Sequence, residues 1–167
     1  MIMNPAHLHL MLNHIPLVGI GFVILLLIIA LLRRSNEMIN ISLLFVILVA
    51  LWAIPAYLTG ESAEEIIEGL PGISEQLIEA HEESAELAFI FVEAVGVLAF
   101  ITLVARRFYT KLGKVLAILT LLGLIIGGGL IAWTANQGGK INHPEIRADT
   151  SALSVPSYKS GEESDDD

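Results

Sequence analysis

Histidines are the residues of this sequence best suited to chemistry. The chain has five of them, and an imidazole nitrogen is a common ligand of transition metals and of haem iron. The absence of cysteine excludes a disulfide framework, a Cys-zinc site, an iron–sulfur cluster, a thiol nucleophile and a covalently attached c-type haem. A haem in this protein would therefore be non-covalent haem b, with histidine as its axial ligand.

The spacing of the histidines favours one pair. His14 stands directly before an apolar stretch at 15–32, and His81 precedes another at 87–105, so both are expected near one end of a helical bundle. In a straight helix His81 would lie about 9 Å beyond the apolar boundary. That difference in depth counts against a simple His14–His81 pair across one iron. His9 and His143 are the alternative haem ligands.

A non-haem centre is the second interpretation of these residues. It would join His14 and His81 to Glu82 or Glu86, because imidazole and carboxylate together suit iron, copper or zinc. Such a metal site needs several ligands that converge. The alternative for the upper glutamates is a solvated helix face without any ligand role.

Glu93 is the most distinctive single residue, since it lies about 10 Å inside the apolar stretch 87–105. An ionised carboxylate costs several kcal/mol in hydrocarbon, and the four apolar stretches contain no Lys or Arg. We therefore expect Glu93 to be protonated and to donate a hydrogen bond across the bundle. Further acids follow at helical spacing toward solvent and suggest either a proton path or a solvated face: Glu79, Glu82 and Glu86.

Composition predicts the architecture that must position these residues. Hydrophobic residues make up 54% of the 167, charged residues 16%, and the mean hydropathy is +0.72, whereas a soluble domain is about 45–50% apolar and about 25% charged. An ordinary globular enzyme and a disordered protein are thereby excluded. The net charge of −9 argues against a nucleic-acid partner, because phosphate binding needs clustered basic residues.

Four stretches are long enough to cross a bilayer as helices, namely 15–32, 41–58, 87–105 and 115–134. The first is not expected to be a cleaved signal peptide, since no Lys or Arg precedes it. The predicted fold is an all-α, integral membrane four-helix bundle over residues 1–147. Residues 148–167 form a Ser- and acid-rich tail that we expect to be disordered.

Basic residues predict the orientation. Six of the nine Lys and Arg lie in the two short connections, which therefore face the cytoplasm. Both termini and the 59–86 connection would then lie on the outer, periplasmic side of a bacterial inner membrane. In that connection Ser62 and Glu65 predict a capping box that opens an amphipathic helix. Ser74 is expected to cap the third long helix, and the glycines at 138–139 to end the fourth.

Four blocks of sequence resemble a family of uncharacterised bacterial four-helix integral membrane proteins, a domain-of-unknown-function group with a histidine–proline first helix. The blocks are LHLMLNHIPLVG at 8–19, PAYLTGESAEE at 55–65, AHEESAE at 80–86 and AWTANQGGKINHPEIR at 132–147. The resemblance covers residues 6–147 and implies that the histidine and acid blocks belong to one pattern. It implies no activity. The chain departs from the pattern in its His-Ile-Pro at 14–16 and its longer acidic connection.

Two functions from different classes follow. The first is a membrane subunit of a respiratory or other electron-transfer complex, with haem b or a metal near its outer face. The second is an accessory subunit that holds a larger complex in the bilayer and carries no chemistry. In neither case is the chain expected to be an enzyme by itself. Its partners would be the lipid bilayer and other membrane or periplasmic subunits, cytochromes among them.

Overall fold

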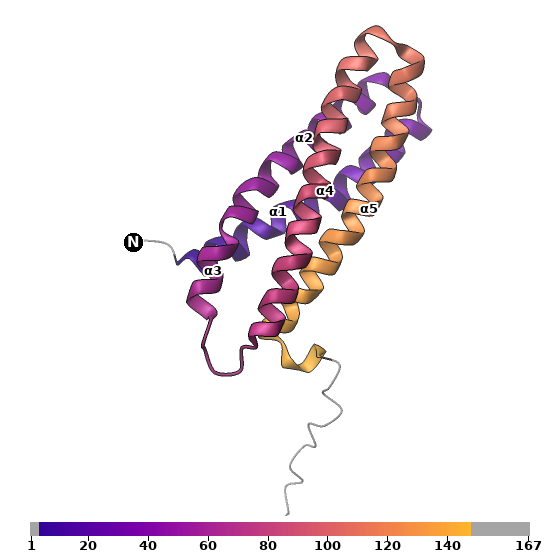
Figure 1. Cartoon of the computed structure of the whole chain (residues 1–167). Coiled ribbons are helices and arrows are strands. Elements are labelled where there is room, and N and C mark those ends of the chain that lie inside the picture. The colour runs from indigo at the N-terminus through magenta and orange to yellow at the C-terminus, as the bar shows by residue number, and fades with distance from the viewer. Residues whose placement is uncertain (1–3, 148–167) are drawn as a thin grey trace, which may run out of the picture.

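The computed structural model describes residues 4–147, and every regular element in that range is helical. The predicted acidic tail, 148–167, lies outside the described residues. Figure 1 shows the long helices side by side and a short one beside the N-terminal start of the first. The elements are α1 (Pro5–Leu32), α2 (Asn36–Leu58), α3 (Gly60–Ile67), α4 (Glu75–Phe108), α5 (Thr110–Asn142) and a final 3₁₀ turn, η1 (Pro144–Ile146).

The four long helices are each long and apolar enough to cross a membrane, which confirms the all-α fold with four candidate spans. Helix α2 packs against α1 and α4, and α5 packs against α4 and α1, so the four close into one bundle. Large apolar side chains face outward along its length; Phe22, Phe100 and Ile126 are all more than half exposed. A soluble bundle would place polar residues there, whereas a bilayer solvates apolar ones.

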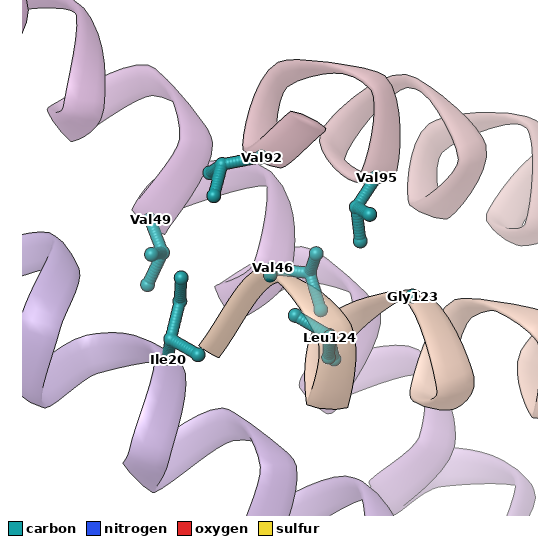
Figure 2. Close-up of a pocket in the computed structure, with 8 residues that line it drawn as sticks. Ile20, Val46, Val49, Val92, Val95, Gly123 and Leu124 are labelled. Atoms are coloured by element: carbon teal, nitrogen blue, oxygen red, sulfur yellow. The ribbon is translucent and has the colours of Figure 1, made fainter. Parts of the chain in front are cut away.

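Small residues bring the helices into close contact. A Cβ atom on Gly96 would lie 2.5 Å from the Cβ of Ala50, and one on Gly123 would lie 2.9 Å from Val95 Cγ2. Close approach of backbones at glycine and alanine is the usual packing mode of membrane helices. The apolar side chains labelled in Figure 2 converge on a central void of only about 10 Å³. The middle of the bundle is therefore filled by its own side chains.

Helix starts follow from local capping. Asn4 Oδ1 accepts a hydrogen bond from the Ala6 amide at 2.9 Å, with Pro5 in the first position. Ser35 Oγ accepts one from the Met38 amide at 3.3 Å. Helix α4 starts directly after Ser74 and continues for 34 residues without a break, but the Ser74 side chain does not make the predicted capping hydrogen bond. The helix consequently projects beyond its apolar stretch and carries His81 on that extension.

Two boundaries differ from the predicted ones. Helix α3 starts at Gly60 after a single intervening residue, Thr59, rather than at a capping box on Ser62. The Thr59 hydroxyl donates to the carbonyls of Pro55 and Ala56 and so holds the chain close to the end of α2. Helix α5 continues through the predicted stop at 138–139 to Asn142. Packing against the extension of α4 offsets the low helix propensity of glycine there.

Candidate functional site

The terminal end of the bundle is formed by the start of α1, the end of α2, the start of α4 and the end of α5. All five histidines lie at this end. His9 on α1 and His81 on α4 come together, with ring centroids 6.5 Å apart and ring planes at 80°. Both rings are partly buried, whereas His7, His14 and His143 are exposed. The structure thus pairs His81 with His9, and not with His14.

Each ring of the pair is oriented by a main-chain carbonyl. His9 Nδ1 donates to the Ala56 oxygen at 3.0 Å and also approaches Thr59 Oγ1 at 3.2 Å. Ala56 lies in the last turn of α2, where carbonyls lack a partner within the helix. Because a carbonyl can only accept, Nδ1 of His9 carries a proton. Nε2 is then the nitrogen left for a ligand.

His81 is held in the same way from the opposite side. Its Nδ1 donates to the Thr134 oxygen of α5 at 3.0 Å, and the Thr134 hydroxyl donates back to the Ser84 oxygen of α4 at 2.9 Å. Gly138 makes room for the ring, since a Cβ there would lie 3.0 Å from His81 Cε1. An imidazole that donates through one nitrogen to a carbonyl presents the other in a defined direction, as metal-binding histidines commonly do.

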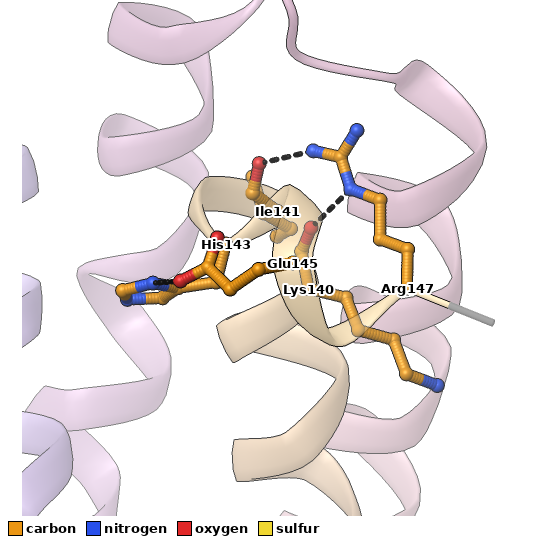
Figure 3. A network of polar contacts seen from close by, with 5 residues as sticks. All are labelled: Lys140, Ile141, His143, Glu145 and Arg147. Carbon is orange, nitrogen blue, oxygen red and sulfur yellow. Dashed lines mark hydrogen bonds and ion pairs between the residues drawn. The ribbon is translucent and has the colours of Figure 1, made fainter. Parts of the chain in front are cut away.

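The remaining histidines point elsewhere. His14 Nδ1 donates to the Leu10 carbonyl of its own helix. His143 contacts Glu145 at 2.8 Å beyond the end of α5 (Figure 3). A main-chain hydrogen bond to the Glu145 carboxylate, together with its contact to His143, holds the pKa of Glu145 below its ordinary value. His14 and His143 thus contact other groups and do not add a third ligand to the His9–His81 pair.

Arg147 closes this end of the bundle. Its guanidinium donates to the Lys140 and Ile141 carbonyls at 2.8 and 2.9 Å, as Figure 3 shows, and to the Gly72 carbonyl at 3.3 Å. Two of these acceptors are carbonyls of the last turn of α5, which lack helical partners. The third belongs to the connection that precedes α4. Arg147 therefore ties the end of α5 to that connection.

The glutamates near His81 do not assemble a metal centre. Glu82 and Glu86 are exposed, and an open crevice beside α3 is lined by Ile78 and by five carboxylates: Glu64, Glu68, Glu75, Glu79 and Glu82. Within residues 4–147 no group of three or more His, Asp or Glu side chains could hold a metal ion. The structure does not bring His14 to His81, Glu82 and Glu86, the ligands expected for a non-haem site.

Glu93 is partly buried within the apolar part of α4. Its Oε1 atom is shielded from solvent and has no hydrogen-bond partner among the described residues. The hydrogen bond expected from Glu93 across the bundle is thus not formed in this part of the chain. Phe89 and Gly96, one turn to either side, both face α2: Phe89 stacks on Tyr57 at 4.3 Å, and Gly96 abuts Ala50.

Two partners of the histidine pair could not be found from residue types alone. Ala56 and Thr134 act through main-chain carbonyls, which every residue has, so no side-chain pattern marks them. Gly138 did carry a signal, because a glycine inside a predicted helix often marks a close approach. Its place beyond the last apolar stretch predicts a helix end instead.

Comparison of the chain with protein-family models, with curated proteins and with solved structures gives no match in any of the three. The resemblance of the four sequence blocks to a bacterial membrane family accordingly stays a prediction. What the chain does has to be argued from its own geometry.

Proposed function

We propose that this protein is a membrane subunit of an electron-transfer complex that holds haem b between His9 and His81 at the terminal end of the bundle. The observation that carries the proposal is the pair itself. The ring centroids of two imidazoles from different helices lie 6.5 Å apart. Each ring donates a hydrogen bond from Nδ1 to a main-chain carbonyl, and its Nε2 makes no hydrogen bond among the described residues. A haem iron held in this way supplies one-electron chemistry, while the chain supplies ligands and orientation.

The number of ligands favours haem over a bare metal ion. Structural zinc takes four protein ligands and catalytic zinc three, whereas the described residues offer two imidazoles and no converging carboxylate. A haem would need only two ligands from the protein, and His9 and His81 would supply them. Copper bound by two imidazoles is the remaining candidate and gives a different spectrum.

The two rings are close enough that both would contact one bound group, since their centroids lie 6.5 Å apart. Both rings also lie beside a glycine. A Cβ added to Gly60 would lie 3.7 Å from His9 Cε1, and Gly138 lies beside His81. Since the central void is only about 10 Å³, a macrocycle would lie at the terminal end and not inside the bundle.

The proposed orientation places the terminal end outside a bacterial inner membrane. It is supported by the six basic residues of the two short connections at the opposite end. In this orientation the histidine pair faces periplasmic subunits and cytochromes, and the exposed glutamates around it give that surface a negative field. Electrons would enter or leave the membrane complex at this face.

The test compares paired and unpaired histidines in the full chain purified from haem-supplied cells. His9→Ala and His81→Ala should each abolish or strongly shift the Soret and reduced α-bands. His14→Ala and His143→Ala are matched controls, since those rings are exposed at the same end, and they should keep the parental spectrum. Metal analysis accompanies the spectra, so that copper without haem is recognised as a different centre.

A colourless, metal-free parent protein that retains its partners would overturn the proposal and favour an accessory subunit without chemistry. Loss of the bands in the His14 and His143 variants, with no loss in the paired ones, would place the haem elsewhere. Helical content by circular dichroism separates loss of cofactor from loss of fold, because packing of the four apolar helices does not depend on either imidazole.

A further inference from the structure

We infer that Glu93 is a proton-binding site inside the membrane, which exchanges its proton with water at the terminal end of the bundle. The inference does not depend on a haem. It starts from Oε1 of Glu93, which is buried and has no partner in residues 4–147. If Glu93 were ionised, this oxygen would lack both water and a hydrogen-bond donor, and the neutral acid is the form that such surroundings tolerate.

No cation within the apolar stretches packed against α4 can pair with Glu93. Helices α2 and α5 pack against α4, and neither 41–58 nor 115–134 contains Asp, Glu, Lys, Arg or His. The titratable side chain of α2 nearest to this level is Tyr57, which stacks on Phe89 one turn from Glu93. On α4 itself the nearest charged residues are Glu86 and Arg106.

The position of Glu93 along α4 puts it on the side of the helix that packs against α2. Phe89 and Gly96, one turn to either side, share that face, and both contact α2. Glu93 is not among the residues that line the central void. One of its oxygens is shielded from solvent, while the side chain as a whole is only partly buried.

The distribution of acids along α4 sets the direction of proton exchange. Glu86 lies two turns toward the terminal end, about 10 Å away along the helix, and is exposed. Toward the other end the next charged residue is Arg106, about 20 Å away, whose guanidinium is bound to Asn36 and Asn40. Proton exchange with water on the terminal side is thus the shorter route. The exposed Glu86 carboxylate on that route can accept the proton.

A hydrophobic carbodiimide tests the inference on the full chain in lipid vesicles. Dicyclohexylcarbodiimide reacts with a protonated carboxyl: the acid proton passes to a carbodiimide nitrogen, the carboxyl oxygen bonds to the central carbon, and the product rearranges to a stable acylurea. Peptide mass spectrometry should locate the adduct at Glu93. Labelling should fall as the buffer on the terminal side is taken from mildly acidic to alkaline.

Two variants and a second reagent serve as controls. Glu93→Gln keeps a donor and an acceptor in a similar volume, so it should insert and fold while losing the adduct and the infrared band of a protonated carboxyl. Glu86→Gln should keep the Glu93 adduct. A water-soluble carbodiimide with an added amine should modify Glu86 and leave Glu93 unmodified.

Three results would overturn the inference. One is a Glu93 that stays unlabelled in vesicles at neutral pH but reacts after denaturation, which would indicate an ionised carboxylate paired with a partner's cation. Another is labelling that does not vary with pH. The third is failure of both Glu93→Gln and Glu93→Leu to fold, the second of which removes all polarity. An ionised acid would then be required for the structure.

Discussion

The two ends of the bundle differ in the buried and partly buried polar side chains that join their helices. At the loop end, where the α1–α2 and α4–α5 connections lie, two such contacts link neighbouring helices. Thr102 Oγ1 lies 3.2 Å from Thr120 Oγ1, so that one hydroxyl can donate to the other, and each also lies within hydrogen-bond distance of a carbonyl one turn back in its own helix. Arg106 donates to Asn40 Oδ1 at 2.8 Å and to two oxygens of Asn36.

At the terminal end polar side chains also join neighbouring segments, as Thr134 and Arg147 do, but some polar atoms of the bundle have no partner among the described residues. In that part of the chain Nε2 of His9 and Nε2 of His81 make no hydrogen bond at this end, and Oε1 of Glu93, farther along α4, is buried without one. Buried polar groups are normally satisfied, so the Glu93 oxygen calls for an explanation. The contrast with the loop end is the basis of the two proposals made above, a ligand held by the histidine pair and a proton held by Glu93.

The largest expected effect is a difference in stability between two glycine-to-alanine variants, one at each end of the bundle. Gly113→Ala would bring a Cβ to within 2.8 Å of the Arg106 Cα, and main chain cannot move aside cheaply. We expect a loss of about 2–3 kcal/mol in the free energy of unfolding, as in other overpacked sites. Gly138→Ala instead meets the His81 ring at 3.0 Å, and a ring can turn. It should cost less than about 1 kcal/mol while weakening cofactor binding.

Unfolding in mixed micelles, measured with the visible spectrum of each variant, checks this prediction. If Gly138→Ala were as destabilising as Gly113→Ala and left the spectrum intact, the proposed division between the two ends would fail. Gly129→Ala is a suitable control, because a Cβ there meets nothing within 4 Å.

A smaller effect is expected from the hydroxyl pair at the loop end. Thr102→Val and Thr120→Val each remove one hydroxyl from a fully buried contact. Hydrogen bonds between membrane helices are worth about 0.6 kcal/mol on average in double-mutant cycles. We expect a coupling free energy of that size from the two single variants and the double variant. A coupling indistinguishable from zero would mean that each hydroxyl is satisfied by its own helix alone.

The smallest effect concerns Glu145, which is fully exposed. Its pKa is held below the ordinary value first by a main-chain hydrogen bond and then by His143. A lowered pKa in the folded protein adds stability above the ordinary pKa of the acid, and this stability is lost as the pH falls through the folded value. In His143→Ala the pKa of Glu145 should rise but stay lowered, since the main-chain bond remains. Carbon-detected NMR titration of Glu145 would measure this rise in pKa. An unchanged pKa of Glu145 in the variant would contradict its contact with His143.

The sequence by itself determined how many long helices there are, because apolar stretches of about 20 residues with at most one charge can only be helices in lipid. Ser74 likewise marked the start of α4, whereas the start of α3 and the end of α5 differ from the predicted positions. The sequence also determined that the histidines and nearly all acids gather at one end, because an up-and-down bundle places alternate connections together.

Only the tertiary structure decided which histidines meet. Spacing along the chain sets positions on one helix, but a distance between α1 and α4 depends on how each helix is rotated and how deeply it projects. Those rotations are set by packing of small residues such as Gly96 against Ala50, and the final ring positions by the carbonyls of Ala56 and Thr134. His9 meets His81 for this reason, while His14, close by in sequence, turns outward.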